Sequence, residues 1–181
     1  MQKDFYIVPL VILFCFASAC QDKAAMAELE KFRAQANVEE QNKALMGRIW
    51  ELWNKGEFDA WKQMHADEYA YYSPSNSTKP VSGQETIEMQ KAFIRSFPDA
   101  KLSIEELIAV GDRVISRYIF TGTHKGEFSG IPATGNRVQA SGVMMTRIKN
   151  GKVVEDREDY DIAGMMTQLG MELKPIAEKK K

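Results

Sequence analysis

Two stretches of the sequence carry side chains suited to acid–base chemistry, and the first is a histidine where a strand pattern ends. His124 follows residues with β-branched and aromatic character and precedes a glycine-rich stretch, so a strand gives way to a loop there. A neutral imidazole at this position could polarise a carbonyl group or orient a carboxylate. The alternative is a loop histidine that hydrogen-bonds to the backbone at a turn.

The second stretch is residues 152–161, a densely charged segment with the sequence KVVEDREDYD. Neighbouring side chains of a strand point to opposite faces. This period separates two sets, Glu155, Arg157, Asp159 and Asp161 on one face and Val154, Asp156, Glu158 and Tyr160 on the other. A carboxylate in an apolar pocket has a raised pKa, so it can take up and return a proton near neutral pH. The alternative is that most of these charges are solvated on an edge strand.

Helical periodicity dominates the first half of the chain. Apolar residues at helical spacing predict a helix that ends at residues 54–56, followed by a short helix over residues 58–64. Ser82 and Glu85 form a capping box, which predicts a further helix that runs to Ser96. The tryptophans at helical spacing are expected mainly in the core.

A period of two replaces the helical pattern in the second half. A short tyrosine-rich strand over residues 67–73 comes first, and the four long strands are expected over residues 101–110, 112–123, 137–149 and 152–161. Gly111-Asp112 and Asn150-Gly151 are suited to tight hairpins between two of the pairs. Helices followed by long antiparallel strands indicate an α+β fold, in which a curved antiparallel sheet packs on the N-terminal helices and leaves a cone-shaped pocket. A short helix over residues 162–169 and a lysine-rich tail over residues 175–181 complete the chain.

Composition excludes several classes of function. The 24 basic and 25 acidic residues leave a net charge of -1, so we expect no basic face and no nucleic-acid partner. The sequence contains no glycine-rich phosphate loop that opens a helix, no HExxH motif and no Cys/His metal spacing, so no metal site is predicted.

The N-terminus has the pattern of an export signal. The apolar run over residues 5–16 is too short to span a membrane, and small residues separate it from Cys20. The sequence FASAC resembles a bacterial lipoprotein cleavage box, which implies a signal peptide over residues 1–19 and a lipid on Cys20 that anchors the protein to a membrane of the bacterial cell envelope. A partly helical tether over residues 20–40 would then lead to one domain over residues 41–174. Plain secretion with an incidental cysteine is the alternative.

Four sequence motifs, taken in order, resemble a known family. They are FPD, GDRV-x-x-R, GTHKGEF-x-GIPATG and GKVVE…D…QLG, and together they resemble the SnoaL-like polyketide (ester) cyclases over residues 42–173. This family belongs to the nuclear transport factor 2-like superfold, so the resemblance implies a bent antiparallel sheet with helices that close a cone around a deep pocket. It also implies an intramolecular aldol closure by one acidic residue, with no metal or organic cofactor.

The resemblance also implies a catalytic set. Asp161 stands at the position of the family's strand-end aspartate, with His124 and Tyr72 as its candidate helpers. Tyr72 replaces a common histidine: its hydroxyl can donate to a developing oxyanion but cannot shuttle protons near neutrality. A cation at Arg157 on the same face would lower the pKa of Asp161, which works against a general base. The expected pocket residues are Trp50, Tyr71, Arg117, Met144 and Arg157.

The resulting hypothesis is an exported, lipid-anchored SnoaL-like protein whose pocket takes a hydrophobic, carbonyl-bearing small molecule. If it is an enzyme, it would be a cyclase or isomerase that needs no cofactor. One alternative is a non-catalytic small-molecule or lipid binding protein with the same pocket, which export and the tyrosine at position 72 both favour. A third hypothesis is an interaction module that forms a homodimer through the outer face of the sheet, and an apolar patch there would support it.

Overall fold

The structure is a computed structural model that describes residues 7–172 and 174, with side chains from Lys23 onward. The first six residues of the expected signal peptide and the lysine-rich tail lie outside the described residues. The chain divides into two compact units, residues 1–38 and residues 39–181. The first unit holds the N-terminal part of helix α1 (Ile7–Lys55), and residues 23–38 of this helix are almost entirely exposed. No helix within the described residues is long and apolar enough to cross a membrane.

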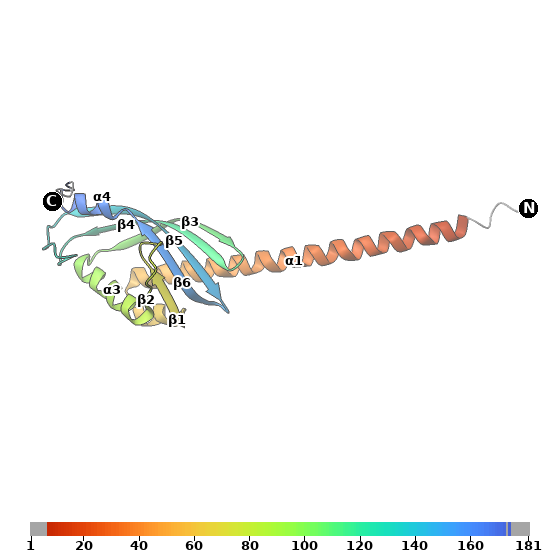
Figure 1. The fold of residues 1–181 in the computed structure, drawn as a ribbon, viewed down its shortest axis with the longest axis horizontal. Helices are drawn as coiled ribbons and strands as arrows, with labels where there is room; N and C mark the ends of the chain where they lie inside the picture. The colour runs from red at the N-terminus through yellow and green to blue at the C-terminus, as the bar shows by residue number, and fades with distance from the viewer. Residues whose placement is uncertain (1–6, 173, 175–181) are drawn as a thin grey trace, which may run out of the picture. The chain divides into compact units, whose positions relative to one another are not determined.

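The second unit packs helices against one face of a six-stranded sheet (Figure 1). After the end of α1 come α2 (Phe58–Gln63), β1 (His65–Tyr72), β2 (Val81–Ser82), α3 (Gly83–Ser96), β3 (Lys101–Val110), β4 (Arg113–Thr123), β5 (Arg137–Lys149), β6 (Lys152–Tyr160) and α4 (Ile162–Gln168). The strand order is β2-β1-β6-β5-β4-β3, and only the β1–β6 pair is parallel. The expected α+β fold with a curved sheet is confirmed.

Local sequence signals set most of the element boundaries. Ser82 and Glu85 form the expected capping box, because the Ser82 hydroxyl accepts from the Glu85 N–H at 3.3 Å and the Glu85 carboxylate accepts from the Ser82 N–H at 3.0 Å. Asn150 and Gly151 connect β5 to β6 with φ values of 50° and 71°, the conformation of a two-residue hairpin turn. The last strand differs from the prediction, since β6 ends at Tyr160 and Asp161 is the N-cap of α4.

Polar side chains fix the C-terminal part of α1 to the sheet. The Asn54 side chain donates to the Leu102 carbonyl at 2.9 Å and accepts from the Leu102 N–H at 2.8 Å. Trp50, one helical turn before Asn54, and Trp53, next to it, are both buried and line the space between the helix and the sheet. Phe97, which follows α3 and is wholly buried, packs against the rings of neighbouring phenylalanines and completes the core at the other end of the sheet.

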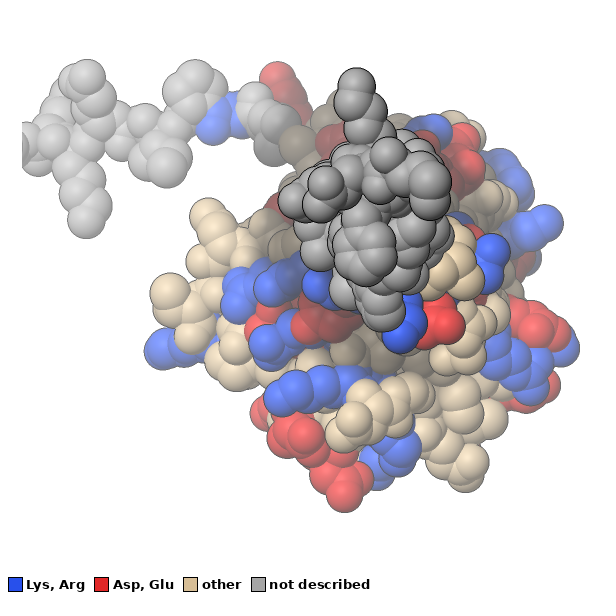
Figure 2. Space-filling model, turned by 90° about the vertical axis from the view of Figure 1, so that its right-hand side faces the viewer, with Lys and Arg blue, Asp and Glu red and all other residues tan. Residues whose placement is uncertain are grey.

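The charged surface is mixed. On the face shown in Figure 2, Lys and Arg side chains are interspersed with Asp and Glu side chains. This arrangement agrees with the net charge of -1.

Candidate active site

A cavity of about 420 Å³ lies between the helices and the inner face of the sheet in the second unit. Aromatic side chains are the largest group in its walls, with ten members: Trp50, Trp53, Trp61, Tyr69, Tyr71, Phe93, Tyr118, Phe120, Phe128 and Tyr160. A concave apolar site with a few polar groups is typical of small-molecule binding. The polar groups are therefore the part of the wall to consider for chemistry.

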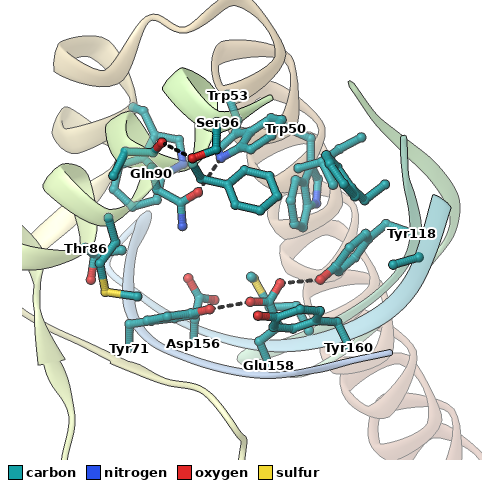
Figure 3. Close-up of a pocket in the computed structure, with 18 of the residues that line it drawn as sticks. Trp50, Trp53, Tyr71, Thr86, Gln90, Ser96, Tyr118, Asp156, Glu158 and Tyr160 are labelled. Carbon is teal, nitrogen blue, oxygen red and sulfur yellow. Dashed lines mark hydrogen bonds between the residues drawn. The ribbon is translucent and has the colours of Figure 1, made fainter. Parts of the chain in front are cut away.

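Two carboxyl groups enter the cavity from β6. Alternation along the strand turns Asp156 and Glu158 inward beside Tyr160, so all three line the cavity (Figure 3). Among the described residues that line the cavity, none is lysine, arginine or histidine. No basic side chain of the described lining therefore neutralises the two acids.

Asp156 is the more deeply buried acid, at 3% exposure. Its two oxygens accept hydrogen bonds from the hydroxyl groups of Tyr69, at 2.8 Å, and Thr146, which lies opposite it on β5. Burial raises the pKa of Asp156 to about 6, although the two hydrogen bonds act in the opposite direction. This carboxyl group can therefore change its protonation state close to neutral pH.

Glu158 is held by two tyrosines that converge from different strands. The Tyr118 hydroxyl donates to Oε1 and the Tyr71 hydroxyl donates to Oε2, as the dashed lines in Figure 3 show. Burial raises the pKa of Glu158, and its charge in turn helps to keep both tyrosines protonated by raising their pKa values, for which burial is the larger cause. Both acids line the cavity, and Glu158 is half-buried whereas Asp156 is buried.

A glycine makes room for one of these tyrosines. Gly142 on β5 pairs with Tyr118 on one side and with Tyr160 on the other. A Cβ atom built at Gly142 would overlap the phenol end of Tyr118. The absence of a side chain at position 142 thus lets the Tyr118 hydroxyl reach Glu158.

The helical wall opposite the acids carries two indole N–H groups with defined partners. Trp50 Nε1 donates to the buried Ser116 hydroxyl at 3.3 Å, and Trp53 Nε1 donates to the Gln90 side-chain oxygen at 2.8 Å. Because each indole N–H is satisfied within the protein, these rings present mainly apolar surface to the cavity.

The structure places three of the expected pocket residues in the cavity wall: Trp50, Tyr71 and Met144. The other two, Arg117 and Arg157, lie on the outer face of the sheet instead. Arg117 pairs with Glu105 and Glu106, and the Arg157 guanidinium stacks 3.9 Å from the ring centre of Tyr72. Strand alternation is the reason, since the neighbours of both arginines point inward.

The three expected catalytic side chains do not line the cavity or meet one another there. Asp161 is exposed and accepts from the Gly164 N–H at 2.8 Å as a helix cap. His124 is wholly buried, stacks on Phe97, and its Nδ1 accepts from the Thr134 N–H at 3.3 Å. These contacts are structural in kind, and Tyr72 likewise lies beneath Arg157 on the outer face.

Asp156 and Glu158 were absent from the sequence-based set of candidates, although the sequence contained a signal for them. Alternation grouped them with Val154 and Tyr160, the apolar members of the segment, and the apolar face of a strand is the one that turns inward. Tyr69 and Tyr71 show the same alternation in β1. Within the described residues no group of three or more His, Cys, Asp or Glu side chains could hold a metal ion.

Comparison with known proteins gives a family match over most of the second unit. The family model described as SnoaL-like polyketide cyclase matches residues 43–169. Two similar proteins are aklanonic acid methyl ester cyclases, DauD of Streptomyces sp. (strain C5) and DnrD of Streptomyces peucetius. Each is 26% identical over 128 residues, which is 70% of this chain and 80% of DauD or 88% of DnrD.

Solved structures show the same fold. AclR from Streptomyces galilaeus is 29% identical with a TM-score of 0.68, and the match covers 73% of this chain and 97% of AclR. TsrD from Streptomyces laurentii is 22% identical with a TM-score of 0.65, over 72% of this chain and 96% of TsrD.

Proposed function

Because the chain belongs to the SnoaL-like polyketide cyclase family, we propose that it is an acid–base catalyst for an uncharged, hydrophobic carbonyl compound. The observation that carries the proposal is the pair of carboxyl groups with raised pKa values on β6, in a mostly apolar cavity. Such a pair resembles the arrangement by which enzymes keep a carboxyl group able to exchange protons near pH 7.

Glu158 is the proposed proton acceptor and donor. It is the less buried of the two β6 acids that line the cavity, whereas Asp156 is buried and hydrogen-bonded to Tyr69 and Thr146. The two acids also interact through charge: the Glu158 carboxylate contributes to the raised pKa of Asp156, because a neighbouring ionised carboxylate makes ionisation of the second one less favourable. Tyr71 and Tyr118 would hold the Glu158 carboxylate in one orientation.

The reaction that fits these groups is an intramolecular aldol closure or a related isomerisation. Glu158 takes a proton from the carbon next to a carbonyl, and the electron pair of that C–H bond forms the enolate. The enolate carbon attacks a second carbonyl carbon of the same molecule, which forms the C–C bond and leaves an alkoxide. The alkoxide then takes the proton back from Glu158, so the step is balanced and uses acid–base catalysis alone.

The charge of the cavity sets the ligand class. Glu127 at the cavity wall adds a third acid to Asp156 and Glu158, and the described lining offers no basic side chain to pair with an anion. Burying a carboxylate of the ligand beside these acids would cost free energy without compensation. A neutral ketone or ester is the expected form of the ligand.

The test is proton exchange on a simple aromatic ketone. The full chain is incubated with 2-acetylnaphthalene in D₂O, and NMR follows the loss of the methyl protons next to the carbonyl. We expect exchange above the solvent background that is lost in Glu158→Gln and kept in Glu68→Gln, a matched change at an exposed position of β1. Tight binding of the ketone without any exchange would support the alternative function, a non-catalytic small-molecule binding protein.

We also propose that the protein is exported and anchored through a lipid on Cys20, on the strength of the FASAC sequence after the apolar run. The test is metabolic labelling of the expressing bacterium with an alkyne fatty acid. Labelled protein in the membrane fraction is expected for the natural chain and for Cys15→Ser, and its loss is expected for Cys20→Ser. Label that persists in Cys20→Ser would contradict the anchor.

Self-association through the outer face of the sheet is a further proposal. Ile108, Ile115, Val110 and Val143 are exposed on adjacent strands of this face, at 40% to 66%. Such a patch is a common feature of interfaces between copies of a protein. Light scattering of the full chain and of Val143→Lys tests it: a dimer that Val143→Lys converts to monomer is expected, and a monomeric natural chain would contradict it.

A further inference from the structure

We infer that Gln90 on α3 binds the carbonyl oxygen of the ligand, and that Trp53 positions it for this task. The inference rests on the proposed function, because it assigns the group that would face the substrate oxygen while Glu158 faces the neighbouring carbon. Neither residue is an acid or a base, so the periodicity of the sequence alone marks them only as part of a helix.

The orientation of the Gln90 amide follows from its partner. An indole N–H can only donate, so the 2.8 Å contact from Trp53 Nε1 requires the Gln90 oxygen on that side. The amide NH₂ group must then point the opposite way. Trp53 is itself held by burial, at 5% exposure, and by the attachment of neighbouring Asn54 to β3, so the amide cannot turn over without breaking a hydrogen bond.

The Gln90 NH₂ group has no hydrogen-bond partner within the part of the chain that the structure describes, and Gln90 lines the cavity. Figure 3 shows its nitrogen directed into the cavity, toward the wall from which Asp156 and Glu158 project. The site thus offers two unused N–H donors on the helical side and acid oxygens on the sheet side. A donor without a partner in a mostly apolar cavity is the group that a ligand acceptor atom would satisfy.

A carbonyl group matches this pair of walls. Its oxygen would accept from Gln90, and the carbon next to it would lie on the side of Glu158. When Glu158 removes the proton, negative charge develops on that same oxygen, so the hydrogen bond from Gln90 strengthens as the enolate forms. Gln90 therefore contributes to both binding and rate, whereas Trp53 acts only by fixing the amide.

The experiment compares two probes of the same shape, 2-acetylnaphthalene and 2-isopropenylnaphthalene, in which a C=CH₂ group replaces C=O. Binding to the full chain is followed by quenching of tryptophan fluorescence. The ketone is expected to bind about 3- to 10-fold more tightly than the alkene, the value of one hydrogen bond. Gln90→Met keeps the length of the side chain but removes the donors, so this preference should disappear while the affinity for the alkene stays the same.

Two more variants separate binding from structure. Gln84→Met changes an exposed glutamine of the same helix and should keep the preference. Trp53→Phe removes the donor that orients the amide and should give a smaller preference than the natural chain. The infrared carbonyl stretch of the bound ketone should be lower in the natural chain than in Gln90→Met, a shift that a purely structural role for Gln90 would not produce.

The outcomes distinguish this inference from the proposed function. Retention of the ketone preference in Gln90→Met, or an unchanged carbonyl stretch, would overturn the role of Gln90 even if Glu158 catalyses exchange. Equal binding of ketone and alkene to the natural chain would do the same. Failure of the natural chain to bind either probe would overturn both proposals, whereas a Gln90-dependent preference without exchange would leave Gln90 as part of a binding site and remove only the catalytic role.

Discussion

The buried carboxyl group of Asp156 should make the stability of the protein depend on pH in a specific interval. Its pKa in the folded state, about 6, lies above its ordinary value of 3.8. Folding therefore takes up a proton between these two values, and the free energy of unfolding must decrease as pH rises through the interval. Asp156→Asn removes the titrating group and keeps a side chain of nearly the same size.

The magnitude follows from the two pKa values. A pKa difference of about 2 corresponds to about 3 kcal/mol, at 1.36 kcal/mol for each factor of ten in proton affinity. The natural chain should lose about 3 kcal/mol of stability relative to Asp156→Asn between pH 3.5 and pH 7. The hydrogen bonds from Tyr69 and Thr146 affect the absolute offset between the two proteins but not this slope.

The assay is urea unfolding followed by tryptophan fluorescence at half-unit steps of pH. The free energy of unfolding of the natural chain minus that of Asp156→Asn is plotted against pH. Subtraction removes the contribution of His65, which has the opposite sign. Burial lowers the pKa of His65 to about 4, so stability from this group increases as pH rises.

Asp67→Asn, a change at an exposed position of β1, controls for the loss of a charge. A flat difference curve, or one that rises with pH, would refute the account of a desolvated acid in the cavity.

Three further predictions concern the supports of the site. Gly142→Ala should push Tyr118 away from Glu158 and reduce ketone exchange at least tenfold with little loss of secondary structure, as NMR exchange and circular dichroism would measure. Ser82→Ala removes the capping box of α3 and should cost about 1 kcal/mol in urea unfolding. Asp161→Asn should preserve both stability and ketone exchange, because asparagine caps helices as well as aspartate does. Asp161→Ala should lower the free energy of unfolding by about 1 kcal/mol and leave ketone exchange in place.

Each of these has an outcome that contradicts it. Normal exchange in Gly142→Ala would mean that the Tyr118 contact is not needed. Ser77→Ala, a change in the loop before β2, is the control for the capping box, and equal stabilities of the two serine variants would count against the cap. Loss of exchange in Asp161→Asn would return the catalytic role to Asp161, as the family resemblance implied.

The sequence by itself determined the succession of elements. Periodicity, the capping box at Ser82 and the Asn150-Gly151 turn are local signals, and each acts over a few residues regardless of the rest of the fold. They located the long strands and helix α3 within a residue or two of their observed bounds. The family motifs implied the same curved sheet and cone as the succession of elements.

The tertiary structure decided the site, because a cavity is made by residues that are distant in sequence. The sequence places Asp156 and Glu158 on one face with Val154 and Tyr160, which favours an inward orientation, but the packing of β6 between β1 and β5 decides that this face lines a cavity. The partners of Glu158, Tyr71 and Tyr118, come from strands 87 and 40 residues away. Gln90 carries no signal of its own, since the direction of its amide depends on Trp53, 37 residues earlier and on another helix. Burial and long-range hydrogen bonds give these ordinary side chains their chemistry, and neither can be predicted from the spacing of residues along the sequence.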